Sequence, residues 1–268
     1  MKSKLLIVLL LLVSSLGLAQ NSHFWDGIEA FDGPTDENPV LAAQIDFYFD
    51  KLVSPLPDSI TMEIDRLAER TSYNTDLRDF ILWHLLEKYR HPEYMNQDQV
   101  FVWLYDHYFS QMEIKDLDDI ILSVIRDKAE RLRRLALFNT APNFMLNDAV
   151  DLWSVESEYI VLFFYDYDCE VCKQEMLDLD TICTSHPEIV TIAIDMNLDS
   201  SGGFGIRSQG NGDLKFPIRH RRITNPSELL MLSDAYDIET TPLIYVLDRD
   251  KRIIAKKIQA RQIGLVLP

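Results

Sequence analysis

The chain has 268 residues, of which 47 % are hydrophobic, and a formal net charge of −17. This length and apolar content are sufficient for two folded domains, each with its own core. The strong acidity argues against partners such as nucleic acid and anionic membrane surfaces, which would repel the protein. A local basic stretch at 219–222 (RHRR) is interpreted as a solvated loop.

The N-terminus has the layout of a secretory signal. Two basic residues, Lys2 and Lys4, precede an apolar run, and small residues lead up to Ala19. This pattern predicts a signal peptide over residues 1–19 that is cleaved after Ala19. The apolar run is shorter than the roughly 20 residues that a membrane helix needs. We therefore expect an exported protein without stable membrane insertion after cleavage, with an uncleaved anchor as the alternative.

The next part of the chain is predicted to be helical. Residues 20–38 are polar and contain Gly and Pro, so we expect a loose lead-in. Over residues 39–138, apolar side chains recur every three or four positions, which is the pattern of amphipathic helices. This stretch is therefore expected to form a small all-α domain of five helices.

After residue 139 the pattern changes to that of an α/β domain, expected over 139–268. The continuous apolar run at 159–165 (YIVLFFY) predicts a strand buried on both faces. Further strands are expected over 188–195, 243–247 and 252–258, with helices over 173–181 and from about 225 to 236. Residues 196–226 contain many Gly and Ser and are expected to be mostly loop.

Two of the three cysteines form a C-x-x-C pair, Cys169 and Cys172, between the first strand and the first helix of this domain. The unpaired N–H groups and the dipole at a helix start stabilise a thiolate at Cys169, and thiolate is the reactive form. One turn further on, Cys172 can close a disulfide. Such a pair beside a βα unit is a redox signature. The alternative is an inert disulfide, but so short a loop removes little chain entropy.

A Thr-Thr-Pro sequence at 240–242 precedes the third strand directly. The order strand, C-x-x-C, helix, strand, helix, Thr-Pro, strand and hairpin resembles the thioredoxin superfamily. Within it, the chain looks most like the TlpA-like periplasmic thiol–disulfide oxidoreductases (redoxins). The sequence APNF at 141–144 resembles their Ala-Pro-Asp-Phe entry, and CKQE at 172–175 resembles their second cysteine followed by Glu. The resemblance covers roughly residues 139–260.

This resemblance implies a fold and a set of roles. The fold would be a thioredoxin-like three-layer sandwich with a central mixed sheet, and Pro242 would be a cis proline that faces the disulfide. Thr241 would offer backbone hydrogen bonds to a bound substrate. The family implies protein thiol or disulfide substrates, an upstream redox partner, no cofactor, no metal, and the periplasm of a Gram-negative bacterium. The preceding helices resemble a poorly characterised helical domain of bacterial envelope proteins, which brings no known activity.

The residues around Cys169 depart from the family pattern. Asp168 stands where the family usually has Trp, and Glu170 lies between the cysteines. Two adjacent carboxylates should raise the pKa of the Cys169 thiol. A less stable thiolate favours the disulfide relative to the dithiol, so we expect a comparatively reducing pair that donates electrons.

A second departure concerns the proton of Cys172. Phe163 lies six residues before Cys169, where thioredoxin has a buried acid. Proton transfer at Cys172 therefore needs another base, and Glu175 and Asp166 are candidates. The family's helix-kinking Pro is replaced by Leu177, and the chain after residue 263 is too short for a full terminal helix.

Several alternatives remain open. Cys183 is interpreted as a small buried residue, with a partner-linking thiol as the alternative. A peroxiredoxin would need Thr or Ser where Asp166 stands, and a zinc site lacks a second C-x-x-C. The main alternative function is a non-catalytic envelope binding or scaffold protein with a vestigial thioredoxin-like module. It would use the helical domain, whose aromatic residues include Trp83, Trp103, Tyr105, Tyr108 and Phe109.

Overall fold

The computed structural model describes residues 23–28, 38–111, 114–115, 117–198, 219–223 and 225–267. The predicted signal peptide at 1–19 and most of the predicted loop lie outside these residues. The chain divides into two compact units between Arg126 and Asp127, and each unit is described separately below. The domain boundary expected after residue 138 stays a prediction. Within the described residues, no helix has the length and apolarity that crossing a membrane requires.

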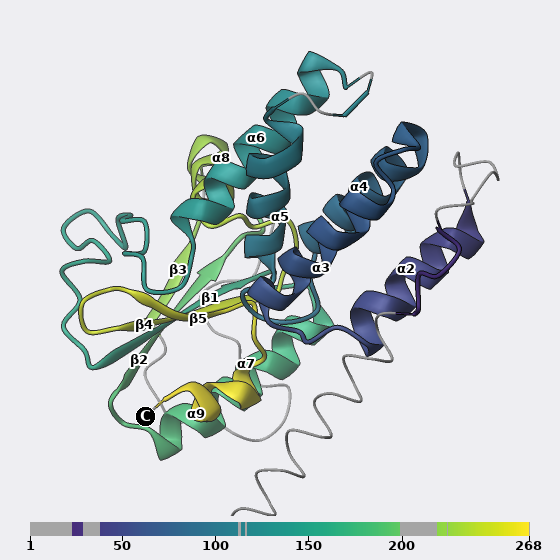
Figure 1. Ribbon diagram of the computed structural model, residues 1–268. Helices are drawn as coiled ribbons and strands as arrows, with labels where there is room; N and C mark the ends of the chain where they lie inside the picture. Colours follow the sequence, from purple (N-terminus) through teal and green to yellow (C-terminus); the bar gives the residue numbers. More distant parts are fainter. Residues whose placement is uncertain are drawn as a thin grey trace, which may run out of the picture. The chain divides into compact units, whose positions relative to one another are not determined.

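The first unit is helical, as the apolar periodicity predicts. Its core is formed by the apolar faces of these helices, and Ile45, Ile60 and Leu85 are fully buried in it. The elements, drawn from purple to teal in Figure 1, are α2 (Pro39–Lys51), α3 (Pro57–Arg70), α4 (Thr75–Arg90), α5 (Asp98–Leu104), the π-helical turn η2 (Tyr105–Phe109) and the start of α6 (Asp119–Arg134).

Part of the expected lead-in is packed rather than loose. Trp25 is buried, and its ring lies edge-on to that of Tyr48 with 5.1 Å between the ring centroids. Its carbonyl oxygen accepts a hydrogen bond from Arg70 Nη2 at 3.2 Å. The Tyr73 hydroxyl donates to the carbonyl of Ile28 at 2.7 Å. These contacts attach residues 23–28 to the helical core, which polar composition alone does not predict.

The second unit is built on a five-stranded mixed sheet with the strand order β3-β2-β1-β4-β5 among the described residues. Strands β2 and β3 run parallel to β1, whereas β4 is antiparallel to β1 and β5 antiparallel to β4. The central position of β1 explains its uninterrupted apolar sequence. The strands are β1 (Tyr159–Tyr165), β2 (Ile189–Asp195), β3 (Arg219–Arg222), β4 (Leu243–Asp248) and β5 (Ile253–Lys256).

Helices cover the two faces of this sheet, as expected for a three-layer sandwich. On one face, alternate residues such as Leu162 and Phe164 pack with Leu232 of α8 (Pro226–Ala235). On the other face, Thr191 of β2 contacts Cys183 of α7 (Glu170–Ser185). The chain ends in η3 (Ala260–Gln262) and the four-residue α9 (Ile263–Val266), beside α7 (Figure 1). The short C-terminal helix agrees with the sequence expectation.

Strand β3 corrects the interpretation of the RHRR stretch at 219–222 as a solvated loop. Residues Arg219–Arg222 pair in parallel with the end of β2, from Ile192 to Asp195. The sequence RHRR has no apolar alternation, and β3 lies at the edge of the described sheet. An edge strand of this kind is held through backbone hydrogen bonds, which side-chain periodicity does not reveal.

A buried ion-pair network ties the C-terminal half of α6 to the segment before β4. Lys128 is only 2 % exposed, and its Nζ lies 2.8 Å and 2.9 Å from the two carboxylate oxygens of Asp237. The same ammonium donates to Glu239 at 2.7 Å, and Lys257 donates to Asp237 at 3.1 Å. The pKa of Asp237 is lowered because these cations outweigh the effect of burial.

We predict that Lys128→Met destabilises the second unit by about 3–5 kcal/mol, because it leaves the buried carboxylate of Asp237 with fewer cationic partners. Urea unfolding followed by circular dichroism measures this change. Lys115→Met is the control, because Lys115 pairs with Asp76 on the surface at 3.4 Å and should change stability by less than about 1 kcal/mol. Equal stability of the two variants would contradict the role assigned to the network.

Candidate active site

The site begins where β1 ends and α7 starts. Helix α7 begins at Glu170, earlier than the expected residue 173, so Cys169 is its N-cap residue. The backbone N–H of Cys172 donates a hydrogen bond to Cys169 Sγ at 3.2 Å. A sulfur in this position lies against the unpaired N–H groups and the positive end of the helix dipole. This is the environment that stabilises a reactive thiolate.

The two cysteines differ in their access to solvent. Cys169 is partly exposed, whereas Cys172 is 1 % exposed, and both are free thiols. Burial raises the pKa of the Cys172 thiol to about 12, and a hydrogen bond with Cys169 contributes to the increase. The outer sulfur can therefore meet a substrate, while the inner sulfur is kept protonated and shielded.

The Thr-Pro segment before β4 lies at the same place. The Thr241–Pro242 peptide bond is cis, as the resemblance implied. The side chain of Thr241 lies near the Cys172 thiol and lowers its pKa, which partly opposes the effect of burial. The structure thus brings Cys169, Cys172 and Thr241 together from distant parts of the sequence. The substrate-binding role of Thr241 and Pro242 stays a prediction.

An amide connects two of the acidic residues near Cys169. Asn197 Nδ2 donates to Asp166 Oδ1 at 2.9 Å and to Asp168 Oδ2 at 3.2 Å. Asp166 Oδ1 also accepts from the backbone N–H of Asp168 at 2.8 Å. Sequence reasoning missed Asn197. This residue follows β2 by two positions, and because β1 and β2 are parallel, their C-terminal ends lie at the same end of the sheet. The amide holds both carboxylates in a fixed position beside the C-x-x-C turn.

The other predicted acids also have partners. Glu170, which is exposed, pairs with Lys173 Nζ at 2.6 Å, and this cation offsets part of its charge. Glu175 Oε2 accepts a hydrogen bond from the backbone N–H of Ala260 at 2.6 Å, which fastens η3 to α7. Neither Glu175 nor Asp166 is therefore an isolated base. Their role in proton transfer, and the effect of Asp168 and Glu170 on Cys169, stay predictions.

The third cysteine lies inside the sandwich. Cys183 is 2 % exposed, and its sulfur is 3.1 Å from the Thr191 hydroxyl oxygen. Burial raises the pKa of this thiol as well. A thiol in this environment behaves as a small buried residue and is not presented to a partner. No group of three or more His, Cys, Asp or Glu side chains that could hold a metal ion occurs among the residues that the structure describes.

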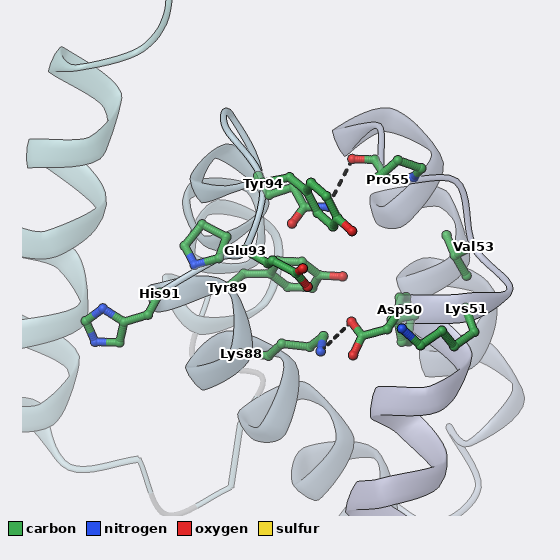
Figure 2. A pocket seen from close by; sticks show the side chains of 12 residues that line it. Asp50, Lys51, Val53, Pro55, Lys88, Tyr89, His91, Glu93 and Tyr94 are labelled. Carbon is green, nitrogen blue, oxygen red and sulfur yellow. Dashed lines mark hydrogen bonds and ion pairs between the residues drawn. The ribbon is translucent and has the colours of Figure 1, made fainter. Parts of the chain in front are cut away.

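A pocket of about 400 Å³ lies in the helical unit (Figure 2). Its wall includes the buried side chains of Phe49, Val53 and Tyr89, and the exposed ring of Tyr94. Figure 2 shows the hydroxyl groups of Tyr89 and Tyr94 directed toward the side lined by Pro55 and Val53. A pocket of this size could hold a small ligand.

Charged groups complete this pocket. Lys88 Nζ pairs with Asp50 at 2.7 Å and with Asp46 at 3.2 Å. Burial raises the pKa of Tyr89, and the carboxylates of Asp50 and Asp46 add to the increase. The aromatic residues singled out in the sequence lie elsewhere: Phe109 is buried against Trp83, with 5.0 Å between ring centroids. The pocket residues were missed because Tyr89 has the spacing of a core position.

Comparison with known proteins clarifies the fold. No protein-family model and no curated protein matches the chain. A crystal structure of a thioredoxin-like protein from Bacteroides caccae aligns with a TM-score of 0.67 and 14 % sequence identity, covering 92 % of this chain and 90 % of that one. The fold is thioredoxin-like. Because the alignment covers most of both chains, the likeness includes the preceding helices, and the expected fold class is confirmed.

Two further solved structures align with about half of this chain. One is the thioredoxin domain of a thiol-disulfide oxidoreductase from Bacteroides vulgatus, with 16 % identity and a TM-score of 0.39, and the alignment covers 49 % of this chain and 96 % of that one. The other is a thiol:disulfide interchange protein from a Bacteroides species, with 16 % identity and a TM-score of 0.38, and the alignment covers 48 % of this chain and 86 % of that one.

We predict that only one thiol of the native, reduced protein reacts readily with iodoacetamide at pH 8, and that this thiol is Cys169. A thiol with a pKa of about 12 is ionised in about one molecule in ten thousand at this pH, so Cys172 should be protected, as should the buried Cys183. Mass spectrometry of labelled peptides measures the extent of reaction at each site. Denatured protein, in which all three should react, is the control. Faster labelling of Cys172 than of Cys169 would contradict the assignment.

Proposed function

We propose that this protein is an exported thiol–disulfide oxidoreductase of the TlpA-like type that exchanges electrons with protein thiols or disulfides. The observation that carries this proposal is the arrangement at the start of α7. There, a partly exposed Cys169 sulfur caps the helix, and a buried Cys172 lies one turn further on, next to Thr241. A thioredoxin-like fold is consistent with such chemistry.

The chemistry has two steps in the direction of reduction. The Cys169 thiolate attacks a substrate disulfide, so that one substrate thiolate leaves and a mixed disulfide forms. Cys172 then attacks Cys169 Sγ, which forms the Cys169–Cys172 disulfide and releases the second substrate thiolate. The helix start favours the thiolate that begins the first step. The shielding of Cys172 leaves Cys169 as the sulfur that meets the substrate.

The charges near Cys169 support the proposed direction of exchange. Asp168 and Glu170 bring negative charge to a position where thioredoxin-like proteins usually have other residues, and Asn197 fixes the carboxylate of Asp168. Negative charge disfavours the dithiol form with its thiolate, and this favours the disulfide. The pair is therefore proposed to act as a reductant, which an upstream redox partner returns to the dithiol state.

The proposed location follows from the N-terminal sequence. The basic, apolar and small-residue order of residues 1–19 supports export, and resemblance to the TlpA-like proteins supports the periplasm of a Gram-negative bacterium. The negative charge of the chain is consistent with protein partners and not with nucleic acid.

We predict a two-electron redox transition for the purified protein without its signal sequence, equilibrated in dithiothreitol or glutathione buffers. Its midpoint should lie closer to the about −270 mV of thioredoxin than to the about −120 mV of a strong oxidant. Trapping free thiols with a mass tag measures the reduced fraction. Cys172→Ser should abolish the transition, whereas Cys183→Ser should leave it unchanged. A midpoint near −120 mV would contradict the reducing role, and the absence of a transition would contradict the function.

A second candidate function is ligand binding by the helical unit, with the thioredoxin-like unit as a vestigial module. The observation in its favour is the pocket of about 400 Å³ around Tyr89 and Tyr94, which is lined by both apolar and polar side chains. The hydroxyl groups of Tyr89 and Tyr94 would offer hydrogen bonds to a small ligand held in this pocket.

The two functions predict different phenotypes in a strain that lacks the protein and carries variants in its place. The oxidoreductase function predicts that Cys169→Ser abolishes complementation and that Tyr94→Ala, which alters the exposed wall of the pocket, is tolerated. The binding function predicts the reverse. Immunoblotting controls for the amount of each variant. Complementation by Cys169→Ser together with failure of Tyr94→Ala would overturn the oxidoreductase function in favour of the binding function.

A further inference from the structure

The proposed exchange reaction leaves one proton unassigned. Cys172 must lose its proton before it attacks the mixed disulfide, but its burial raises the pKa of the thiol to about 12. At neutral pH, resolution therefore requires a base close to Cys172. Phe163 occupies the position at which thioredoxin has a buried acid, and Glu175 and Asp166 are only partly buried.

The alternation of side chains along β2 places another carboxylate on the correct face of the sheet. The Thr191 hydroxyl contacts Cys183 of α7, so Thr191 points to the α7 face. Successive side chains of a strand alternate between faces, and Ile192 and Ile194 belong to the core on the opposite face. Asp195, four residues after Thr191, therefore shares the α7 face. It is only 5 % exposed.

The lengths of the two elements place this carboxylate at the level of the active cysteines. From Thr191 to Asp195, a strand advances about 13 Å at about 3.3 Å per residue. From Cys183 back to Cys172, a helix spans about 16 Å at about 1.5 Å per residue. Because Cys183 and Thr191 are in contact and α7 runs opposite to β2, Cys172 comes to lie near the end of the strand where Asp195 is found.

Tyr165 connects the two groups electrostatically. Tyr165 of β1 is the register partner of Asp195 in the parallel β1–β2 pair, so the two residues share a face. Tyr165 is buried, and the charges of Asp195 and Cys172 both act on its hydroxyl and raise its pKa. Both groups therefore lie within electrostatic range of one phenol, at the same edge of the sheet.

The described groups around Asp195 come from each adjacent element. Asn197 donates its backbone N–H to Asp195 Oδ1 at 3.1 Å, and its side chain carries the contacts to Asp166 and Asp168. On the other side, the backbone of Asp195 pairs with Arg222 of β3. Tyr165 faces Asp195 from β1, and Cys172 approaches from α7. The other buried acid among the described residues of the second unit is Asp237, and its carboxylate forms ion pairs with Lys128 and Lys257.

We propose that Asp195 is the proton acceptor for Cys172 in the second step of exchange, an inference that rests on the proposed oxidoreductase function. As Cys172 Sγ attacks Cys169 Sγ, its proton passes to the Asp195 carboxylate. The new Cys169–Cys172 bond forms, the bond between Cys169 and the substrate sulfur breaks, and the electron pair leaves with the substrate thiolate. In the reverse direction the protonated Asp195 returns the proton to Cys172.

The test is a stopped-flow reaction of the reduced protein with an aromatic disulfide whose thiolate is coloured. The first coloured thiolate reports attack by Cys169, and the second reports resolution by Cys172. Asp195→Asn keeps the shape and the oxygen that accepts from Asn197 but removes the base. We expect resolution to slow about a hundredfold at pH 7. We also expect it to become tenfold faster per pH unit up to pH 10, because the variant depends on the spontaneous thiolate of Cys172. The first release should be unchanged.

The controls separate this inference from the function on which it rests. Asp195→Glu should restore part of the resolution rate, and Asp250→Asn, in the exposed turn before β5, should change neither step. Unfolding curves check that each variant is folded. Normal resolution in Asp195→Asn, or the same loss and pH slope in Glu175→Gln or Asp166→Asn alone, would overturn the role of Asp195 and leave the function intact. No release of either thiolate by the wild type would instead overturn the function.

Discussion

The candidate site depends on one junction, the change from β1 to α7 within five residues. The central strand pairs with a neighbouring strand on each side, so its last residue, Tyr165, has a defined place at the C-terminal end of β1. The chain then turns and enters a helix whose first free N–H groups meet the sulfur of Cys169. Every later feature of the site is arranged around this sulfur: the buried Cys172, the Thr241 side chain, and the carboxylates held by Asn197.

The two faces of the sheet carry different kinds of residues. One face carries the apolar core with α8, and the other carries the cysteines of α7 together with Tyr165 and Asp195. Tyr165 and Asp195 lie at the end of the α7 face at which the site is found. The Lys128 network holds Asp237 and Glu239, which lie in the segment between α8 and Thr241. The chain is therefore fixed directly before the cis peptide bond of Thr241–Pro242.

Some of this arrangement is readable from the sequence, and the reasons differ from element to element. The run at 159–165 predicts β1 with its observed limits, because a central parallel strand is apolar throughout. The RHRR strand was missed, because an edge strand needs only its backbone to pair. The earlier start of α7 was missed because Cys and acidic residues give no helical periodicity. The sequence predicts Asp195 as the last residue of a strand, but it does not show that this side chain lies on the same face of the sheet as Cys172. That assignment depends on the contact between Cys183 and Thr191, which only the structure provides.

The buried position of Cys183 has a practical consequence. A thiol enclosed between α7 and β2 and hydrogen-bonded to Thr191 becomes accessible to reagents only when these two elements separate. Hydrogen exchange reports such openings through many amides at once, whereas this sulfur reports them at one chemically distinct atom. The rate at which a thiol reagent modifies Cys183 therefore measures how often α7, the helix that carries the active cysteines, separates from the sheet.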